Sequence, residues 1–197
     1  MKNLLKTEHP VSTSYAYSNL GAGLLGYTLG LAQKTSFQQL VQKRIFDKYH
    51  MSQSFTHSQR GNNHLVKGRD SVGTVVSNWD FDALFGGGGI LSTTADLAKF
   101  ADAQFNPANK ALSLTRKPTF TINEHMKIGL GWHILKSENG KDIYWHNGGT
   151  GGYSSSMAVN TETRTAVIIL SNVSAFNPKM ANIDKLCFEL LDNMDEK

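Results

Sequence analysis

The strongest constraint on the fold is a change of sequence period in the last third of the chain. From Lys127 onward, runs rich in β-branched and aromatic residues predict strands rather than helices. The dipeptide Asn139-Gly140 is a strong signal for a two-residue hairpin, and residues 161–165 supply a second turn. The sequence therefore predicts an antiparallel meander. We expect strands over residues 127–135, 142–146, 154–160 and 166–172.

Helical patterns precede this sheet. Residues 20–32 are apolar but rich in glycine, so we expect a helix held by close packing rather than by its own propensity. A serine N-cap predicts a second helix over residues 37–49. Thr93 and Asp96 have the spacing of a capping box before a third helix over residues 95–105.

A final helix completes the expected architecture. Pro178 stands near its start, and its apolar face should lie on the sheet. The fold class is therefore α+β: helices and loops over about 1–125, and a helix-backed antiparallel sheet over about 126–197. Residues 1–197 are taken as part of a single domain. The apolar members of the final helix are Met180, Ile183, Leu186, Cys187, Leu190 and Met194.

Composition excludes several classes of function. The 20 Lys and Arg residues against 16 Asp and Glu are scattered, so no nucleic-acid partner is expected. The single cysteine, Cys187, permits no intramolecular disulfide and no cysteine-rich metal site. No stretch approaches the length of a membrane span. We expect no metal and no cofactor, because the histidines outside residue 146 lack ligand spacing and should be exposed or lightly packed: His9, His50, His57, His64, His125 and His133.

Three short segments carry residue types suited to chemistry. They are Tyr17-Ser18-Asn19 before the first helix, residues 86–100, and residues 145–153 between two strands. Each has a plain structural alternative, because a tyrosine can be buried, an asparagine can cap a helix, and glycines can form a bulge or a tight turn. Their joint occurrence in this order is what favours a functional interpretation.

Together the segments resemble the serine β-lactamase and penicillin-binding-protein superfamily, in its class C β-lactamase-related branch. Tyr17-Ser18-Asn19 looks like the Tyr-x-Asn motif of that family, and residues 88–93 look like its Gly-Gly-Leu-x-Ser-Thr stretch. His146-Asn147-Gly148 is similar to the His-x-Gly variant of its Lys-Thr-Gly motif. The resemblance covers nearly the whole chain and implies an incomplete β-lactamase/transpeptidase-like fold.

The resemblance also implies roles for individual residues in an acyl-enzyme mechanism. Tyr17 would shuttle a proton, and Asn19 would hold the amide of the substrate. His146 would carry charge or relay a proton near neutral pH. The backbone N–H of Gly149 would be the second donor of an oxyanion hole. The expected substrate-binding residues are Asn147, Gly148 and Thr150.

The first motif of the family, Ser-x-x-Lys, is missing. No serine here has a lysine three positions later, and the nearest approach, Ser113 to Arg116, follows Tyr17 instead of preceding it. We therefore expect the nucleophile upstream of Met1, and the chain to be a fragment, a truncated form or a degenerate relative. Alone it should be inactive, and it should expose an apolar groove, associate with itself or pair with the missing N-terminal segment.

The resemblance implies that the intact parent is a serine hydrolase acting on β-lactams, D-amino-acid peptides or small esters. The alternative is a non-catalytic relative that binds peptidoglycan-like peptides or a protein partner, because no serine-lysine pair is present. The resemblance further implies an extracytoplasmic location, in the periplasm or at the cell surface. Any export signal would then lie upstream of this chain.

Overall fold

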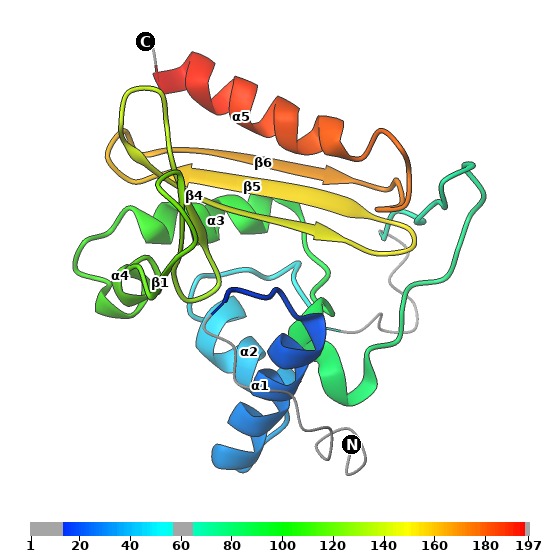
Figure 1. The fold of residues 1–197 in the computed structure, drawn as a ribbon. Coiled ribbons are helices and arrows are strands. Elements are labelled where there is room, and N and C mark those ends of the chain that lie inside the picture. The colour runs from blue at the N-terminus through cyan, green and yellow to red at the C-terminus, as the bar shows by residue number, and fades with distance from the viewer. Residues whose placement is uncertain (1–13, 57–64, 196–197) are drawn as a thin grey trace.

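A six-stranded antiparallel sheet, with its strands in sequence order, dominates the computed structural model, which describes residues 14–56 and 65–195. Figure 1 shows α5 on one face of this sheet and α3 on the other, with α1 and α2 beyond α3. The expected α+β class is confirmed. The strands are β1 (Phe120–Thr121), β2 (Met126–Ile128), β3 (His133–Lys136), β4 (Asp142–Gly149), β5 (Ser154–Asn160) and β6 (Thr165–Ser171).

The main difference from the predicted sheet is a turn inside the expected strand over residues 127–135. The chain reverses there and forms β2 and β3, which pair antiparallel. Gly129 and Gly131 allow this reversal, because a side chain on Gly129 would come within 2.4 Å of a backbone oxygen and Gly131 has φ of 86°. The next turn contains Asn139-Gly140 as predicted, with φ of 75° at Gly140, but it spans residues 137–141 between β3 and β4 instead of the two residues expected.

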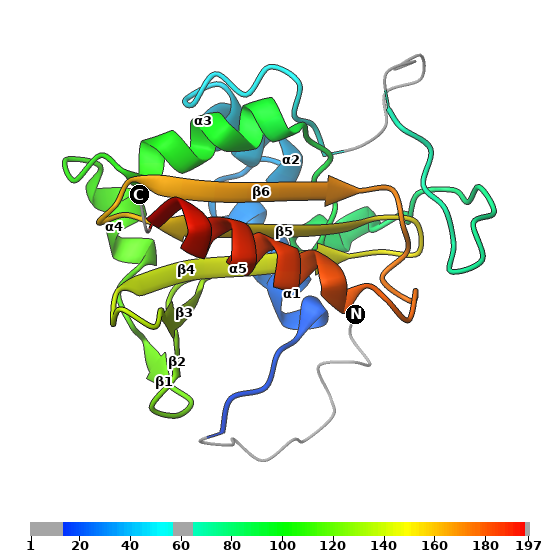
Figure 2. The same ribbon diagram turned by 90° about the horizontal axis from the view of Figure 1, so that it is seen from above.

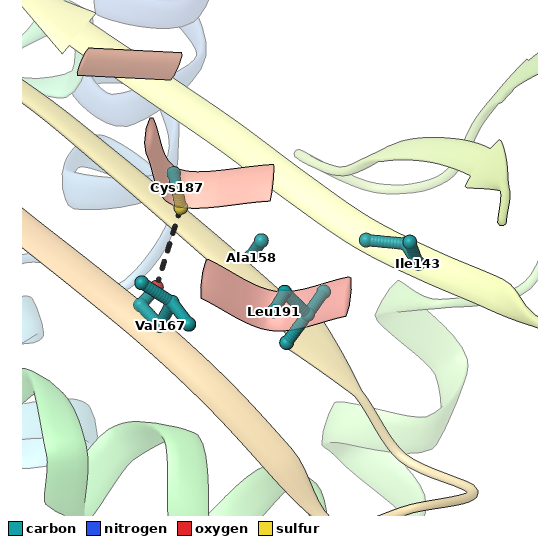
Figure 3. Packing of buried hydrophobic residues seen from close by; sticks show 5 residues of the cluster. All are labelled: Ile143, Ala158, Val167, Cys187 and Leu191. Carbon is teal, nitrogen blue, oxygen red and sulfur yellow. Dashed lines mark hydrogen bonds between the residues drawn. The ribbon is translucent and has the colours of Figure 1, made fainter. Parts of the chain in front are cut away.

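The final helix, α5 (Ala181–Asp195), covers one face of the sheet (Figure 2), but not with the predicted stripe. Cys187 and Leu191 are fully buried, whereas Leu186, Leu190 and Met194 are about half exposed. The helix backs the sheet as predicted and Cys187 belongs to the predicted face, but Leu186, Leu190 and Met194 were assigned to that face wrongly. Figure 3 shows the buried pair packed on Ile143, Ala158 and Val167.

The helical side of the molecule is held together by glycines. The buried residues of α1 (Asn19–Ala32) are Gly23, Gly26 and Gly30, so the helix packs closely, while its leucines other than Leu24 are exposed. Its neighbour is the 3-10 helix η3 (Asp82–Gly87), which the sequence did not predict. The remaining helices are α2 (Phe37–Val41), the π-helix η2 (Gln42–Phe46), α3 (Thr94–Gln104) and α4 (Lys110–Thr115).

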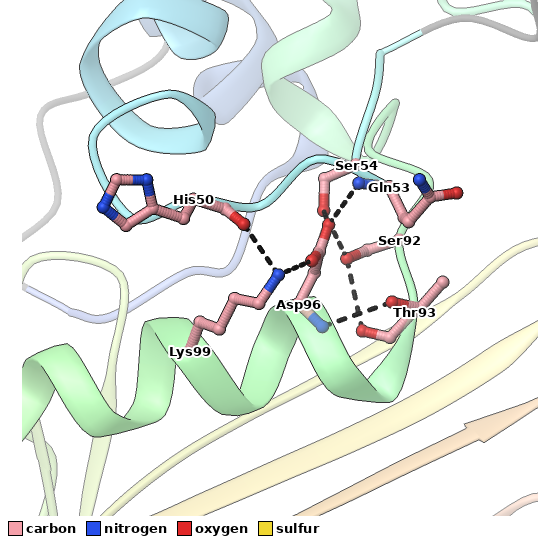
Figure 4. Close-up of polar contacts among 7 residues, drawn as sticks. All are labelled: His50, Gln53, Ser54, Ser92, Thr93, Asp96 and Lys99. Atoms are coloured by element: carbon pink, nitrogen blue, oxygen red, sulfur yellow. Dashed lines mark hydrogen bonds and ion pairs between the residues drawn. The ribbon is translucent and has the colours of Figure 1, made fainter.

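A buried carboxylate at the start of α3 connects this helix to the segment that follows η2. Thr93 caps the helix by accepting the N–H of Asp96, at 3.2 Å. The Asp96 side chain does not complete the predicted capping box. It accepts instead from the N–H of Gln53 at 2.6 Å, from the Ser54 hydroxyl and from Lys99, both at 2.8 Å (Figure 4). This network fixes the segment after η2 onto α3.

Candidate active site

Tyr17 and His146 come together from opposite ends of the described chain. Tyr17 precedes α1, where the hydroxyl of Ser18 caps the helix by accepting the N–H of Gly21 at 2.9 Å. His146 lies on β4. Their ring centroids are 6.3 Å apart, and the Tyr17 side chain is 58% exposed. An exposed phenol beside an imidazole is a pair of proton-carrying groups open to a ligand.

The orientation of the His146 ring follows from its own backbone. Nδ1 lies 2.5 Å from the carbonyl oxygen of Asn147. A carbonyl can only accept a hydrogen bond, so Nδ1 carries a proton and donates it. The ring is half-buried, which limits its freedom to rotate away.

One edge of β4 is open beside these two rings. The N–H of Thr150 donates to the carbonyl of Tyr153 on the β5 side, at 2.9 Å. Because N–H groups alternate in direction along a strand, those of Asn147 and Gly149 point to the opposite edge. Within the described residues, β3 pairs with that edge only as far as Trp145. The end of β4 therefore presents backbone donors and acceptors that an extended ligand can pair with.

The two glycines of this strand leave no space for a side chain. A Cβ at Gly148 would lie 2.8 Å from the Ser155 hydroxyl, and one at Gly149 would lie 2.4 Å from Cβ of Ala175. Thr150 is committed to the turn that follows, because its hydroxyl oxygen accepts the N–H of Tyr153 at 3.2 Å. Because the glycines carry no side chains, the backbone of β4 itself lies exposed to the candidate site.

The two asparagines of the motifs are placed differently from one another. The Asn147 amide donates to the carboxylate of Asp184 on α5, at 2.8 Å, so its side chain lies on the face of the sheet that α5 covers. Only its backbone is directed to the open edge. Asn19 opens α1, and its carbonyl oxygen would lie 2.8 Å from a Cβ at Gly87. The Gly86–Gly89 segment thus packs directly against the Tyr-x-Asn segment.

His133 is the residue that the sequence argument missed. It is half-buried, its Nε2 lies 3.2 Å from the hydroxyl of Tyr15, and its ring centroid is 5.5 Å from that of His146. Burial, and then the nearby charge of protonated His146, hold the pKa of His133 below its ordinary value. The pairing of His133 with Trp145 places it beside His146. The hairpin predicted at Asn139-Gly140 is the sequence signal that could have found this neighbour.

Neither a candidate metal centre nor a helix able to cross a membrane is present among the described residues. In residues 14–56 and 65–195, no group of three or more His, Cys, Asp or Glu side chains is arranged to hold a metal ion. Over the same residues, no helix has both the length and the hydropathy that a membrane crossing requires.

Comparison with known proteins adds a family and a fold. The sequence model of the Beta-lactamase family matches residues 3–190. Among curated proteins, Protein flp of Staphylococcus aureus (strain N315) is 25% identical over 187 residues, which cover 87% of this chain and 36% of that protein.

Solved structures share the same arrangement. A β-lactamase from Sulfitobacter sp. EE-36 superposes with a TM-score of 0.85 at 18% identity, covering 100% of this chain and 64% of that one. A β-lactamase/D-alanine carboxypeptidase from Pseudomonas syringae gives 0.75 at 17% identity, covering 88% and 59%. The chain thus spans about a third of the curated relative and less than two thirds of these structures.

Proposed function

This chain belongs to the beta-lactamase family, and from that premise we propose that it forms one wall of a serine-hydrolase active site whose nucleophile lies outside residues 1–197. The observation that carries the proposal is the meeting of Tyr17 and His146 at the open edge of β4. A proton shuttle, a titratable cation and an aligned backbone edge are the parts that acyl transfer needs besides a nucleophile.

The proposed chemistry assigns each group a step. A serine hydroxyl attacks the substrate carbonyl and gives its proton to the phenolate of Tyr17, while the N–H of Gly149 stabilises the oxyanion. The tetrahedral intermediate collapses, and the leaving group takes that proton from Tyr17. Water then hydrolyses the acyl-enzyme by the same route. Positive charge on His146 favours the phenolate, because an opposite charge nearby stabilises the ionised form.

The proposed substrates are β-lactams, D-amino-acid peptides or small esters. The Pseudomonas syringae neighbour is named for action on β-lactams and as a D-alanine carboxypeptidase, which supports this class. The edge of β4 would bind the acyl side of such a substrate as an added strand through the backbone of Asn147 and Gly149, with Gly148 between them and Thr150 ending the strand edge. Asn19 would hold its amide. D-amino-acid peptides are components of the bacterial cell wall, so we also propose an extracytoplasmic location.

A second candidate is a non-catalytic relative that binds peptidoglycan-like peptides or a protein partner. The observation in its favour is that no serine in the chain is followed by lysine at the third position. Such a protein would keep the strand edge for binding and would form no acyl-enzyme.

Covalent labelling separates the two candidates. A fluorescent penicillin and a fluorophosphonate would be added to this chain and to its full-length parent, with mass spectrometry to locate any adduct. We expect the parent alone to be labelled, at a serine outside residues 1–197. Labelling of neither supports the binding relative, and labelling of the isolated chain would contradict our assignment of the nucleophile.

Substitution in the parent tests the residues on this wall. Tyr17→Phe and His146→Asn should each slow labelling about 100-fold, the usual size of a lost proton-transfer group. Tyr27→Phe is the matched control, because Tyr27 lies on α1, the helix that follows Tyr17, and outside the proposed site. Equal rates for Tyr17→Phe and Tyr27→Phe would remove Tyr17 from the mechanism.

A further inference from the structure

A row of aromatic rings connects the segment before α5 with η3. The ring centroids of Trp79 and Phe176 are 6.2 Å apart, and those of Trp79 and Phe81 are 6.1 Å apart. Phe81 continues the row to Phe85 of η3, at 6.3 Å. Separations of about 4.5–7 Å are typical of aromatic rings that pack against one another. We call these four residues the aromatic row.

One end of the aromatic row packs against the turn that follows β4. A Cβ at Gly151 would lie 2.7 Å from Nε1 of Trp79, so the indole lies directly on this turn. The N–H of Ala175 donates to the carbonyl of Thr150 at 2.9 Å, which brings Phe176 to the same turn. Two of the four rings are therefore held at the point where the open edge of β4 ends.

The other end of the row packs against the segment that contains the Tyr-x-Asn motif. A Cβ at Gly88 would lie 3.2 Å from Cζ of Phe81, and a Cβ at the neighbouring Gly87 would lie 2.8 Å from the carbonyl oxygen of Asn19. Figure 1 shows the segment of residues 65–81 running from the β4–β5 turn to the region beside α1. The aromatic row thus bridges the two segments that carry the motif residues.

The row leaves two of its rings open to solvent. Trp79 is 46% exposed and Phe176 is 69% exposed, although each has an aromatic neighbour. The N–H of Phe176 donates to the hydroxyl oxygen of Ser174 at 3.0 Å, which fixes the backbone that carries this ring. Two fixed and uncovered rings gain apolar burial when a ligand places a third ring against them.

The direction of a bound substrate connects this surface with the proposed chemistry. The leaving group takes its proton from Tyr17, so it lies at the end of the β4 edge where Tyr17 meets His146. The acyl end of the substrate then extends the other way, past Gly149 and beyond the end of the strand. The side chains of Trp79 and Phe176 lie in that direction.

We infer that Trp79 and Phe176 are specificity-determining residues, which bind an aromatic group at the acyl end of the ligand. The inference deepens the proposed function and rests on it for the direction in which the substrate lies. It names the substrate class more closely: amides, esters or β-lactams whose acyl group ends in an aromatic ring are preferred over those that end in a methyl group.

Ligand binding to this chain tests the inference without a nucleophile. N-phenylacetyl-D-alanine and N-acetyl-D-alanine differ only in the phenyl ring of the acyl group, and NMR of the indole N–H signals follows the binding of each. We expect the phenylacetyl ligand to bind about 10-fold more tightly, because its ring is buried against two others. Its binding should move the signal of Trp79, while that of Trp132, which is 8% exposed, is the internal reference.

Substitutions separate a ligand contact from a general effect on the fold. Trp79→Ala and Phe176→Ala should each remove most of the preference and leave the affinity for the acetyl ligand unchanged, whereas Trp79→Phe should retain the preference. Phe120→Ala is the matched control, because Phe120 is 39% exposed on β1 and lies outside the aromatic row. A preference that persists in both alanine variants would overturn the inference.

The unsubstituted chain decides the matter if a variant fails to fold. Equal affinity for the two ligands, or binding of neither, contradicts the inference directly. A parent that is never labelled by penicillin, together with a preference that depends on Trp79, would defeat the proposed hydrolase and leave the ligand selectivity standing. Labelling of the parent, together with equal affinity of the chain for both ligands, would do the reverse. The two failures are therefore distinguishable.

Discussion

The buried side chain of Asp96 stays ionised because its hydrogen bonds offset the cost of burying a charge. The carboxylate is 1% exposed. Burial raises its pKa, but hydrogen bonds from Lys99, from the Ser54 hydroxyl and from the N–H of Gln53 outweigh that effect, and the pKa lies below the ordinary 3.8. The ionised form is thus the one that the fold requires. Lys99 is 44% exposed, so its charge is screened and contributes a small share.

Asp96→Asn should lower the free energy of unfolding by about 2–3 kcal/mol, because the amide cannot accept three donors as the carboxylate does. Urea unfolding at pH 7 measures this loss. Asp102→Asn, an exposed substitution on the same helix α3, is the control and should change stability by less than about 0.5 kcal/mol. Equal effects of the two would show that the network stabilises little.

The same residue gives a pH dependence with a definite sign. A folded pKa below the unfolded value means that the stabilisation is complete above about pH 4 and is lost as the pH falls through the folded value. The melting temperature of the chain should therefore fall more steeply between pH 4 and lower pH than that of the Asp96→Asn variant. Parallel curves would contradict this.

At the scale of single residues, the sequence identified important side chains better than it identified the residues that they contact. The Thr93 cap was predicted, but the carboxylate of Asp96 turned away from it toward a segment more than forty positions earlier. Local spacing could not reveal that donor set. For the same reason His133 was overlooked, because its neighbours Tyr15 and His146 are reached only through the fold.

Among the elements, α1 shows that glycine spacing can matter more than leucine spacing. A Cβ at Gly23 would come within 2.9 Å of Leu84 Cβ and 3.1 Å of its Cα, atoms that cannot move without the backbone of η3. A Cβ at Gly21 would make only ordinary contacts at 3.4 Å with the side chain of Ser18. Gly21 and Gly23 therefore lie on the same helix but differ in the space available for a side chain.

Gly23→Ala should therefore destabilise the chain by about 1–3 kcal/mol through overpacking. Gly21→Ala is the matched control, and it should be neutral or stabilise by up to about 1 kcal/mol, since alanine has the higher helix propensity. Thermal unfolding of the two variants side by side measures the difference. A stabilised Gly23→Ala would show that η3 yields without cost.

The periodicity of the sequence located most helices and strands but not their limits. The Asn139-Gly140 turn was placed correctly because the dipeptide encodes it locally. The turn at Gly129 to Gly131 was missed because it depends on the approach of a distant carbonyl, that of Thr115. Part of the α5 face was assigned wrongly, because Leu186, Leu190 and Met194 are as apolar as the residues that face the sheet but are about half exposed.

The molecule as a whole has an uncovered apolar side. On α1, Leu25 is 60% exposed, Leu29 44% and Leu31 62%. The chain also spans less than two thirds of the solved structures to which it is similar. We propose that these leucines are covered by a segment outside residues 1–197 in the intact protein, or by a second copy when the chain is alone.

The isolated chain should therefore bind a hydrophobic dye or self-associate, as measured by fluorescence and light scattering. Leu25→Gln combined with Leu29→Gln should reduce both signals without lowering the melting temperature, because neither side chain is buried. Val72→Gln, at an 84% exposed position outside α1, is the control. A compact monomer that binds no dye would contradict the proposal.

At the scale of the whole molecule, the structure brings the rings of Tyr17 and His146 to a centroid distance of 6.3 Å, and their role in a site stays a prediction. What could not be predicted is which groups of each motif face the ligand. The Asn147 side chain donates to Asp184, and the Thr150 hydroxyl accepts a hydrogen bond within the turn that follows it. Both contacts form only when the sheet is assembled.

The contact between Tyr15 and His133 also bears on folding kinetics. The two residues are separated by 118 positions, so their meeting closes a loop that includes most of the molecule. Local helices and hairpins form long before such a loop, whose closure costs chain entropy that only later contacts repay. We therefore expect the site to be completed last during folding, and proton exchange at its edge to report global assembly.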